Sequence, residues 1–203
     1  MRALTRSTID LNWQLGMHQE RETGPQEWVP AAVPGAVQLD WGQAHGYASY
    51  LLSDHYLDYR WMDDVYWTYR TRLDIPTLGE GDRLFFVCGG VDYRFQVGLG
   101  DTVLHDQEGM FTPVEIELTG LARPGMDLWV CVYPVPKSFT PDPDLNDHEK
   151  PRKQADHSCK PAVSYGWDFH PRLTPLGIWQ ETCLEIRPAA YLVRAGIDYR
   201  LND

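Results

Sequence analysis

The stretch SYGWDFHPRLTPLGIW, Ser164 to Trp179, carries the residue types best suited to chemistry in this chain. It places four aromatic rings beside an aspartate, a histidine and an arginine. Aromatic rings stack on the apolar faces of sugars, and a carboxylate accepts hydrogen bonds from hydroxyl groups. Trp167 and Asp168, with His170 and Arg172 close by, therefore predict a pocket wall for a hydroxylated ligand. The alternative is that the rings are core packing and that Asp168 pairs locally with Arg172.

A second candidate, DPDLND, has part of the spacing of a calcium-binding loop. Asp142, Asp144 and Asn146 alternate as such a loop requires. The glycine expected next is Asp147, however, and the closing glutamate would fall on Lys153. We expect no metal site here, and no cofactor elsewhere.

Glutamates on strand-like segments offer no catalytic pair. Glu115 and Glu117 alternate with apolar residues, and Glu181 and Glu185 flank a cysteine. This alternation is typical of the solvated face of a strand. We therefore expect solvated carboxylates, with no general acid and nucleophile in this chain.

The four cysteines favour a reduced protein. Cys88, Cys131 and Cys183 lie in apolar strand-like runs, where a free thiol behaves as a small buried side chain. No CxxC spacing is present, and Cys159 lies close to His148 and His157 without the spacing of metal ligands. Because the first residues also lack the apolar core of a signal peptide, a cytoplasmic location is favoured.

The elements that must position the aromatic stretch are mainly strands. Apolar residues alternate with polar ones in segments 9–15, 65–75, 93–99 and 114–118, which is typical of strands with one buried face. Gly100 and Asp101 separate two such segments and predict a tight hairpin. Many short strands with few helices predict an all-β sandwich or barrel.

Two short segments have helical features. The run AVQLDWGQAHG places Val37, Trp41 and Ala44 at helical intervals and ends at Gly46, a candidate C-cap. The run SDHYLDYRWMDD predicts a second short helix, with Ser53 or Asp54 as its N-cap.

Length and composition exclude several classes of protein. A chain of 203 residues fits one domain, and its 43% hydrophobic and 23% charged residues are ordinary for a globular protein. The net charge of -11 and the lack of a basic cluster argue against nucleic acid and against an anionic membrane surface as partners. No run approaches the roughly 20 apolar residues that span a bilayer.

Two segments differ from the strand pattern. Residues 134–161 are rich in proline and charge, which predicts a long mobile loop. In the C-terminal segment, residues Val193, Ala195, Ile197 and Tyr199 alternate as in a new strand after a proline. We expect the sandwich to occupy residues 1–187, with 188–203 as a linker and the first strand of a following domain.

Several motifs, in order, resemble the N-terminal sugar-binding domain of family 2 glycoside hydrolases, especially the β-mannosidase branch. The segments WVPAAVPGAVQLDW, DDVYWTYRTRLDIP, LFFVCGGVDYRFQVGLGDTVL and GWDFHPRLTPLGIW carry this resemblance. Phe169 stands where the family favours tryptophan, and His170 where it often has glycine. The hairpin also has Leu99 and Gly100 in place of Asn-Gly.

The resemblance implies a jelly-roll-like β-sandwich of the galactose-binding-like kind. It also implies that an immunoglobulin-like domain and a (β/α)-barrel follow, and that the catalytic glutamates of the parent retaining glycosidase lie on the barrel. A barrel needs around 250 residues, so this chain cannot contain one. In the family, the aspartate of the Gly-Trp-Asp run reaches the glycone subsite, a role that falls on Asp168 with Trp167 beside it.

Three functions remain open from the sequence. The chain could be the non-catalytic N-terminal domain of a family 2 β-glycosidase that acts on a terminal β-linked sugar. It could instead be a stand-alone carbohydrate-binding module of the same fold. A third possibility is an interdomain scaffold without sugar contact.

Overall fold

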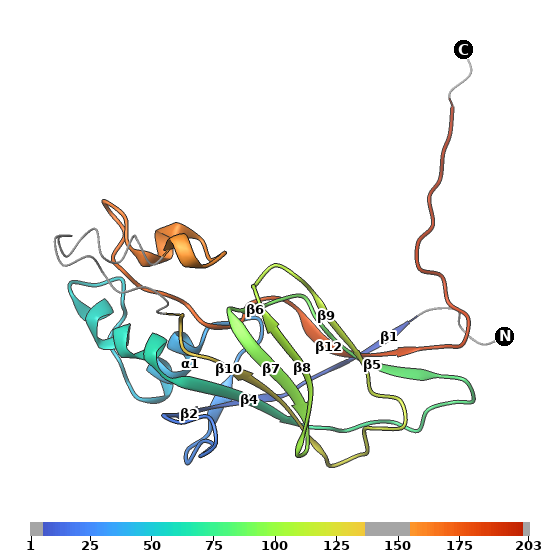
Figure 1. Cartoon of the computed structure of the whole chain (residues 1–203). Helices are drawn as coiled ribbons and strands as arrows, with labels where there is room; N and C mark the ends of the chain where they lie inside the picture. Colours follow the sequence, from blue (N-terminus) through green and yellow to red (C-terminus); the bar gives the residue numbers. More distant parts are fainter. Residues whose placement is uncertain (1–5, 137–154, 201–203) are drawn as a thin grey trace.

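The computed structural model describes residues 6–136 and 155–200, and it shows an antiparallel β-sandwich with a few short helices (Figure 1). A four-stranded sheet has the order β1-β12-β5-β9, and a six-stranded sheet has the order β3-β2-β4-β10-β7-β8. A further two-stranded pair, β11 with β6, lies between the sandwich and the helical segments. The predicted all-β fold is confirmed.

The four-stranded sheet contains β1 (Ser7–Asp10), β12 (Thr182–Arg187), β5 (Arg83–Cys88) and β9 (Val114–Glu117). The six-stranded sheet contains β3 (Val29–Ala31), β2 (Trp13–His18), β4 (Tyr66–Arg72), β10 (Asp127–Val132), β7 (Arg94–Leu99) and β8 (Thr102–Glu108). The small pair contains β11 (Gly177–Ile178) and β6 (Val91–Asp92).

Alternation along the strands builds the core, because successive side chains point to opposite faces. In β4, Trp67 and Tyr69 are fully buried and meet Phe86 and Leu184 of the other sheet in one apolar cluster. The predicted hairpin is also present, since β7 ends at Leu99 and β8 begins at Thr102.

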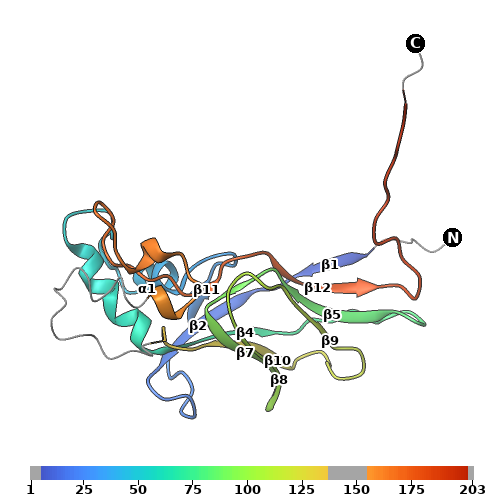
Figure 2. The ribbon, with the colours of Figure 1, turned by 45° about the horizontal axis from the view of Figure 1, so that its top comes forward.

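Helical segments gather at one end of the sandwich (Figures 1 and 2). They are α1 (Val37–Ala44) and three 3-10 helices, η1 (His55–Asp64), η2 (Ala155–His157) and η3 (Ala162–Tyr165). Trp41 of α1 packs edge-on against Trp67 of β4, with ring centroids 5.2 Å apart. This contact fixes α1 over the inner face of the six-stranded sheet. No helix among residues 6–136 and 155–200 is long and apolar enough to cross a membrane.

The helix predictions were right in place and partly wrong in detail. Both predicted helices exist, but Ala44 is exposed, and the buried face of α1 uses Val37, Gln38 and Trp41. Asp54 occupies the N-cap position of η1 without a side-chain capping bond. The buried face of α1 differs in detail from the predicted one because tertiary contacts with the loop 162–178 decide which side chains of this helix are buried.

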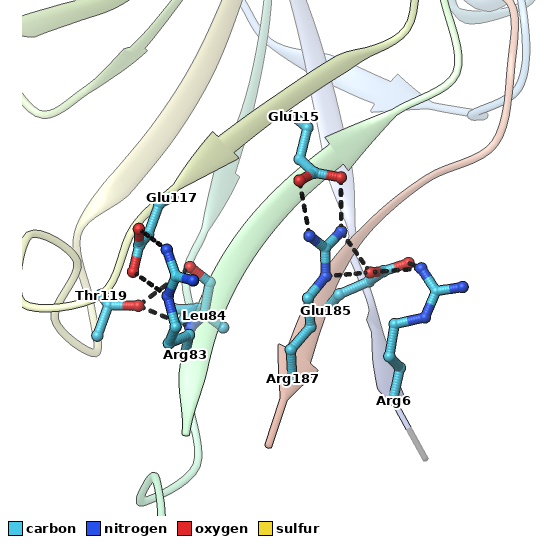
Figure 3. Close-up of polar contacts among 8 residues, drawn as sticks. All are labelled: Arg6, Arg83, Leu84, Glu115, Glu117, Thr119, Glu185 and Arg187. Carbon is cyan, nitrogen blue, oxygen red and sulfur yellow. Dashed lines mark hydrogen bonds and ion pairs between the residues drawn. The ribbon is translucent and has the colours of Figure 1, made fainter. Parts of the chain in front are cut away.

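The expectation of solvated strand glutamates is wrong for Glu185, which is only 9% exposed. Arg187 donates to Glu185 at 2.8 Å and to Glu115 at 2.6 and 2.7 Å (Figure 3). Arg6 lies 3.3 Å from the other side of Glu185. Two guanidinium groups thus replace the water that a buried carboxylate would otherwise need.

The expectation for the cysteines needs one correction, and that for the loop 134–161 is only partly within the described residues. The cysteines are all free, but Cys183 is only half-buried, because its side chain lies on the outer face of β12. Within the predicted loop 134–161, residues 137–154 lie outside the described residues, and with them the calcium-like run and His148. At the described end of that loop Lys160 is buried, whereas Cys159 and Pro161 are exposed, and the mobility of the loop stays a prediction.

The C-terminal segment runs away from the sandwich in both views. Residues 188–200 form no strand, and Val193, Ile197 and Tyr199 are exposed. The predicted strand of a following domain has no partner strand within the described chain, so this assignment stays a prediction.

Candidate functional site

The aromatic stretch divides at Gly166, which has φ 109 and reverses the chain. Before it, Tyr165 is fully buried, and its hydroxyl lies 2.8 Å from Ser158 Oγ. After it, Trp167 and Phe169 are exposed, at 52% and 87%. The core-packing interpretation is therefore right for Tyr165, whereas Trp167 and Phe169 are exposed and the pocket-wall interpretation stays a prediction.

Asp168 lies at the tip of a tight turn that spans Trp167 to His170. The turn is closed by two backbone hydrogen bonds, from Trp167 N to His170 O at 2.9 Å and from His170 N to Trp167 O at 3.2 Å. All four side chains of the turn are exposed. The turn thus presents an indole, a carboxylate and an imidazole together on one projection of the surface.

Arg172 anchors the base of this turn. Its guanidinium lies 2.6 Å from the Asp63 carboxylate at the end of η1, and the two side chains are only 14% and 4% exposed. Of the four predicted site residues, the structure therefore brings Trp167, Asp168 and His170 together in the turn. It places Arg172 beneath them, where it positions the turn against η1.

A second anchor precedes the turn, and it was missed from the sequence. Lys160 makes a buried ion pair with Asp92 of β6, and its Nζ also donates to Pro175 O at 2.8 Å. Burial raises the pKa of Asp92 and lowers that of Lys160, while the attraction between the two charges opposes both shifts. The pair ties both sides of the turn to the small β6–β11 sheet.

The segment after the turn is fixed by α1. Gln38 donates from Nε2 to Thr174 O at 2.9 Å and accepts from Leu176 N at 3.3 Å. Val37 N donates to Leu176 O at 2.9 Å. The turn is therefore held by α1, η1 and β6 together, as a functional loop on a rigid scaffold requires.

A small cavity of about 240 Å³ lies between α1 and this stretch. Its lining is mostly apolar and includes His170; the lining residues are Ala36, Gln38, Leu39, Tyr50, Val163, Ser164, His170, Leu173 and Pro175. The turn therefore lies beside an apolar cavity, and an apolar lining is suited to contact with another surface.

The side chains of the turn are suited to binding a ligand by stacking and by hydrogen bonding. An exposed indole offers a stacking face, and Asp168 offers hydrogen-bond acceptors for hydroxyl groups. Across the described ranges, no three histidine, cysteine, aspartate or glutamate side chains are placed to hold a metal ion.

Comparison with known proteins gives a consistent picture. Residues 13–180 match the family described as the glycosyl hydrolase 2 galactose-binding domain-like domain. The beta-mannosidase B of Aspergillus flavus is 24% identical over 198 residues, which cover 93% of this chain and 23% of that protein. The beta-mannosidase of Mus musculus is 26% identical, over 81% of this chain and 20% of that protein.

Solved structures show the same fold. The beta-D-mannosidase from Dictyoglomus thermophilum superimposes with a TM-score of 0.71 at 20% identity, over 91% of this chain and 22% of that chain. A beta-glucuronidase from Faecalibacterium prausnitzii superimposes with a TM-score of 0.57 at 18% identity, over 93% of this chain and 32% of that chain. This chain thus spans between 20% and 32% of the length of the proteins named here.

Proposed function

This chain belongs to the galactose-binding-like N-terminal domains of glycosyl hydrolase family 2, in the β-mannosidase-like branch, and we propose that its turn Trp167–His170 completes a glycone subsite. The substrate would be a glycan with a terminal β-linked sugar. The domain itself would be non-catalytic, and the catalytic carboxylates would lie on a barrel that follows an immunoglobulin-like domain.

The share of each relative's length that this chain covers supports the assignment of binding to this domain and of catalysis to another. The matched relatives carry the name β-mannosidase, and the chain corresponds to 20–23% of their length. A (β/α)-barrel needs around 250 residues, which the remaining three-quarters of such a protein can supply. The chemical step would therefore belong to that larger part.

One observation carries the proposal: an exposed carboxylate and indole are presented on a turn whose base is anchored by ion pairs with buried side chains. Asp168 would accept hydrogen bonds from glycone hydroxyls, and Trp167 would cover an apolar face of the sugar. His170 would close the turn through its backbone bonds with Trp167. Arg172 would act as a positioning residue through Asp63.

The kinetic test uses the enzyme that carries this domain joined to its catalytic domains. Asp168→Ala should lower kcat/KM for an aryl β-mannoside about ten- to a hundred-fold. A hydrogen bond to a charged group contributes roughly 1.5–3 kcal/mol. Asp74→Ala, at an exposed aspartate beyond the end of β4, is the matched control and should leave kcat/KM unchanged. An unchanged kcat/KM in the Asp168 variant, or an equal loss in both variants, would exclude the subsite role.

A further inference from the structure

A larger cavity, of about 400 Å³, lies on the outer face of the six-stranded sheet. Its floor comes from the side chains of β2, β4, β7 and β10 that point away from the core, such as Thr68, Gln96 and Trp129. Buried Trp67 and Tyr69 occupy the opposite face of the same sheet. The aromatic turn is packed with α1 and η1 on that inner side, so the two sites are separate.

Two walls close this cavity. One is the connection between β2 and β3, which contributes Arg21, Pro25 and Trp28. The other is the β7–β8 hairpin with Asp101 and Val103. In Figures 1 and 2 the β2–β3 connection (blue) projects from the sandwich well away from the segment 155–172 (orange).

Trp129 lies flat on the sheet because its neighbour on β7 has no side chain. Trp129 pairs with Gly98, and a Cβ atom at Gly98 would fall 2.0 Å from the indole Cζ2 atom. The indole Nε1 donates to Gly100 O at 2.8 Å, which fixes the ring in its plane. One face of a half-buried ring thus rests on the backbone, and the other face points into the cavity.

The second indole, Trp28, stacks against a guanidinium group instead. The Arg70 guanidinium lies 3.7 Å from the Trp28 ring centroid and donates to Gln14 at 3.1 Å. Arg21 donates to Gln96 at 2.9 Å. Each guanidinium has five N–H donors, and a bond to one amide oxygen uses one of them. The cavity therefore combines two oriented rings with several fixed polar groups.

The charges of the lining balance. The lining contains two arginines, Arg21 and Arg70, and two aspartates, Asp101 and Asp127. His18 adds no charge at neutral pH, because burial lowers its pKa. A lining with balanced charge, two indoles and many donors and acceptors suits an uncharged ligand that has apolar faces and hydroxyl edges. The volume lies within the roughly 300–1,000 Å³ of ligand sites.

We propose that this cavity binds a segment of a neutral oligosaccharide, as a second carbohydrate site separate from the turn at Asp168. The site would hold a glycan chain on the domain, whereas the turn would contact only the terminal sugar. This binding is a property of the chain alone and does not depend on the proposed subsite role.

The test titrates the 203-residue chain with a β-linked mannotriose and follows the indole N–H signals by heteronuclear NMR. We expect millimolar or tighter binding, with shifts at the Trp129 and Trp28 indoles. Trp129→Ala and Trp28→Ala should each weaken binding about tenfold, as for an aromatic anchor. Tyr199→Ala removes an exposed aromatic ring of the C-terminal segment, outside both sites, and is the matched control; it should bind as the unmodified chain does. Trp167→Ala and Asp168→Ala test instead whether the trimer binds at the turn.

Three results would overturn the proposal that the sugar binds in this cavity. They are no binding at millimolar mannotriose, shifts confined to the Trp167 indole, or loss of binding in the Trp167 and Asp168 variants alone. Tighter binding of an acidic trimer of uronate residues would refute the assignment to a neutral ligand. Wild-type NMR shifts decide the location even if Trp129→Ala fails to fold.

Discussion

Lys160 and Asp92 form an ion pair with side chains that are only 0% and 4% exposed, and it joins the segment before the aromatic turn to β6. Lys160 also holds Pro175 on the far side of the turn. A charged pair in the interior is costly unless both members are present. The pair therefore makes the position of the turn dependent on two residues far from its tip.

Removal of one partner should destabilise the domain strongly. In Lys160→Met the Asp92 carboxylate is left buried without its counter-ion, and the expected loss is about 3–5 kcal/mol in the free energy of unfolding. Urea denaturation measures it. Lys160→Met combined with Asp92→Leu should recover much of the loss, because neither charge then remains. Wild-type stability in the single variant would show that the pair is not formed.

Gly98 should tolerate no side chain. Gly98→Ala would press a methyl group against the Trp129 ring, since a separation of 2.0 Å is far below van der Waals distance. We expect a loss of about 1–3 kcal/mol, typical of overpacking, and a shift in tryptophan fluorescence as the indole leaves the sheet. Gly196→Ala, at a glycine with open space around its Cβ position and no positive φ, tests whether any added methyl group has the same fluorescence effect. An unchanged emission spectrum in Gly98→Ala would contradict the description of the ring as lying flat on the strand.

An ion pair between Arg83 and Glu117, on the outer face of the four-stranded sheet, predicts that the stability of the fold depends on pH (Figure 3). The Arg83 guanidinium lowers the pKa of Glu117 from 4.5 to about 2. A carboxyl group with a lowered folded-state pKa stabilises the fold above its unfolded-state value, and this contribution is lost as pH falls from about 4.5 through about 2.

Stability measured by denaturant titration should therefore fall over that acidic range, and less steeply in Glu117→Gln. Glu181→Gln, at an exposed glutamate before β12, is the control. High salt should weaken the effect, because both partners are solvent-exposed. Equal pH profiles for the wild-type chain and Glu117→Gln would rule out this ion pair as the cause.

The isolated chain should not hydrolyse aryl β-mannosides. Retaining glycosidases need two carboxyl groups about 5–5.5 Å apart, one as nucleophile and one as general acid. The strand carboxylates Glu115 and Glu185 are both bound to Arg187 and serve as ion-pair partners. Release of nitrophenol by repurified chain would contradict the assignment of catalysis to another domain.

The period-two pattern predicted most of the strands, because each buries one face. Trp67 and Tyr69 alternate with polar neighbours, and both belong to the core. The turn at Asp168 could also be predicted from the sequence, because several aromatic residues between a glycine and a proline are unusual in a loop. The sequence pattern could not separate Tyr165 from Trp167, because burial there is decided by the packing of η3 and by the reversal at Gly166.

Long-range polar pairs were not predictable from spacing. Lys160 lies 68 positions from Asp92, in a segment whose composition predicts mobility, and Arg172 pairs with Asp63 from a different element. The cavity on the outer face of the six-stranded sheet has only a weak signal in the sequence. Trp129 falls on the outward phase of β10 and faces Gly98, but strand pairing is needed before that relation can be recognised.

The most direct test of the central claim is a crystal structure of the enzyme that contains this domain, with a mannose-configured inhibitor bound at its catalytic centre. The account predicts an Asp168 carboxylate oxygen within hydrogen-bond distance of a glycone hydroxyl, roughly 2.5–3.0 Å, with the Trp167 ring beside the sugar. A structure in which the turn Trp167–His170 lies remote from the bound sugar, with no direct or water-mediated contact, would contradict it.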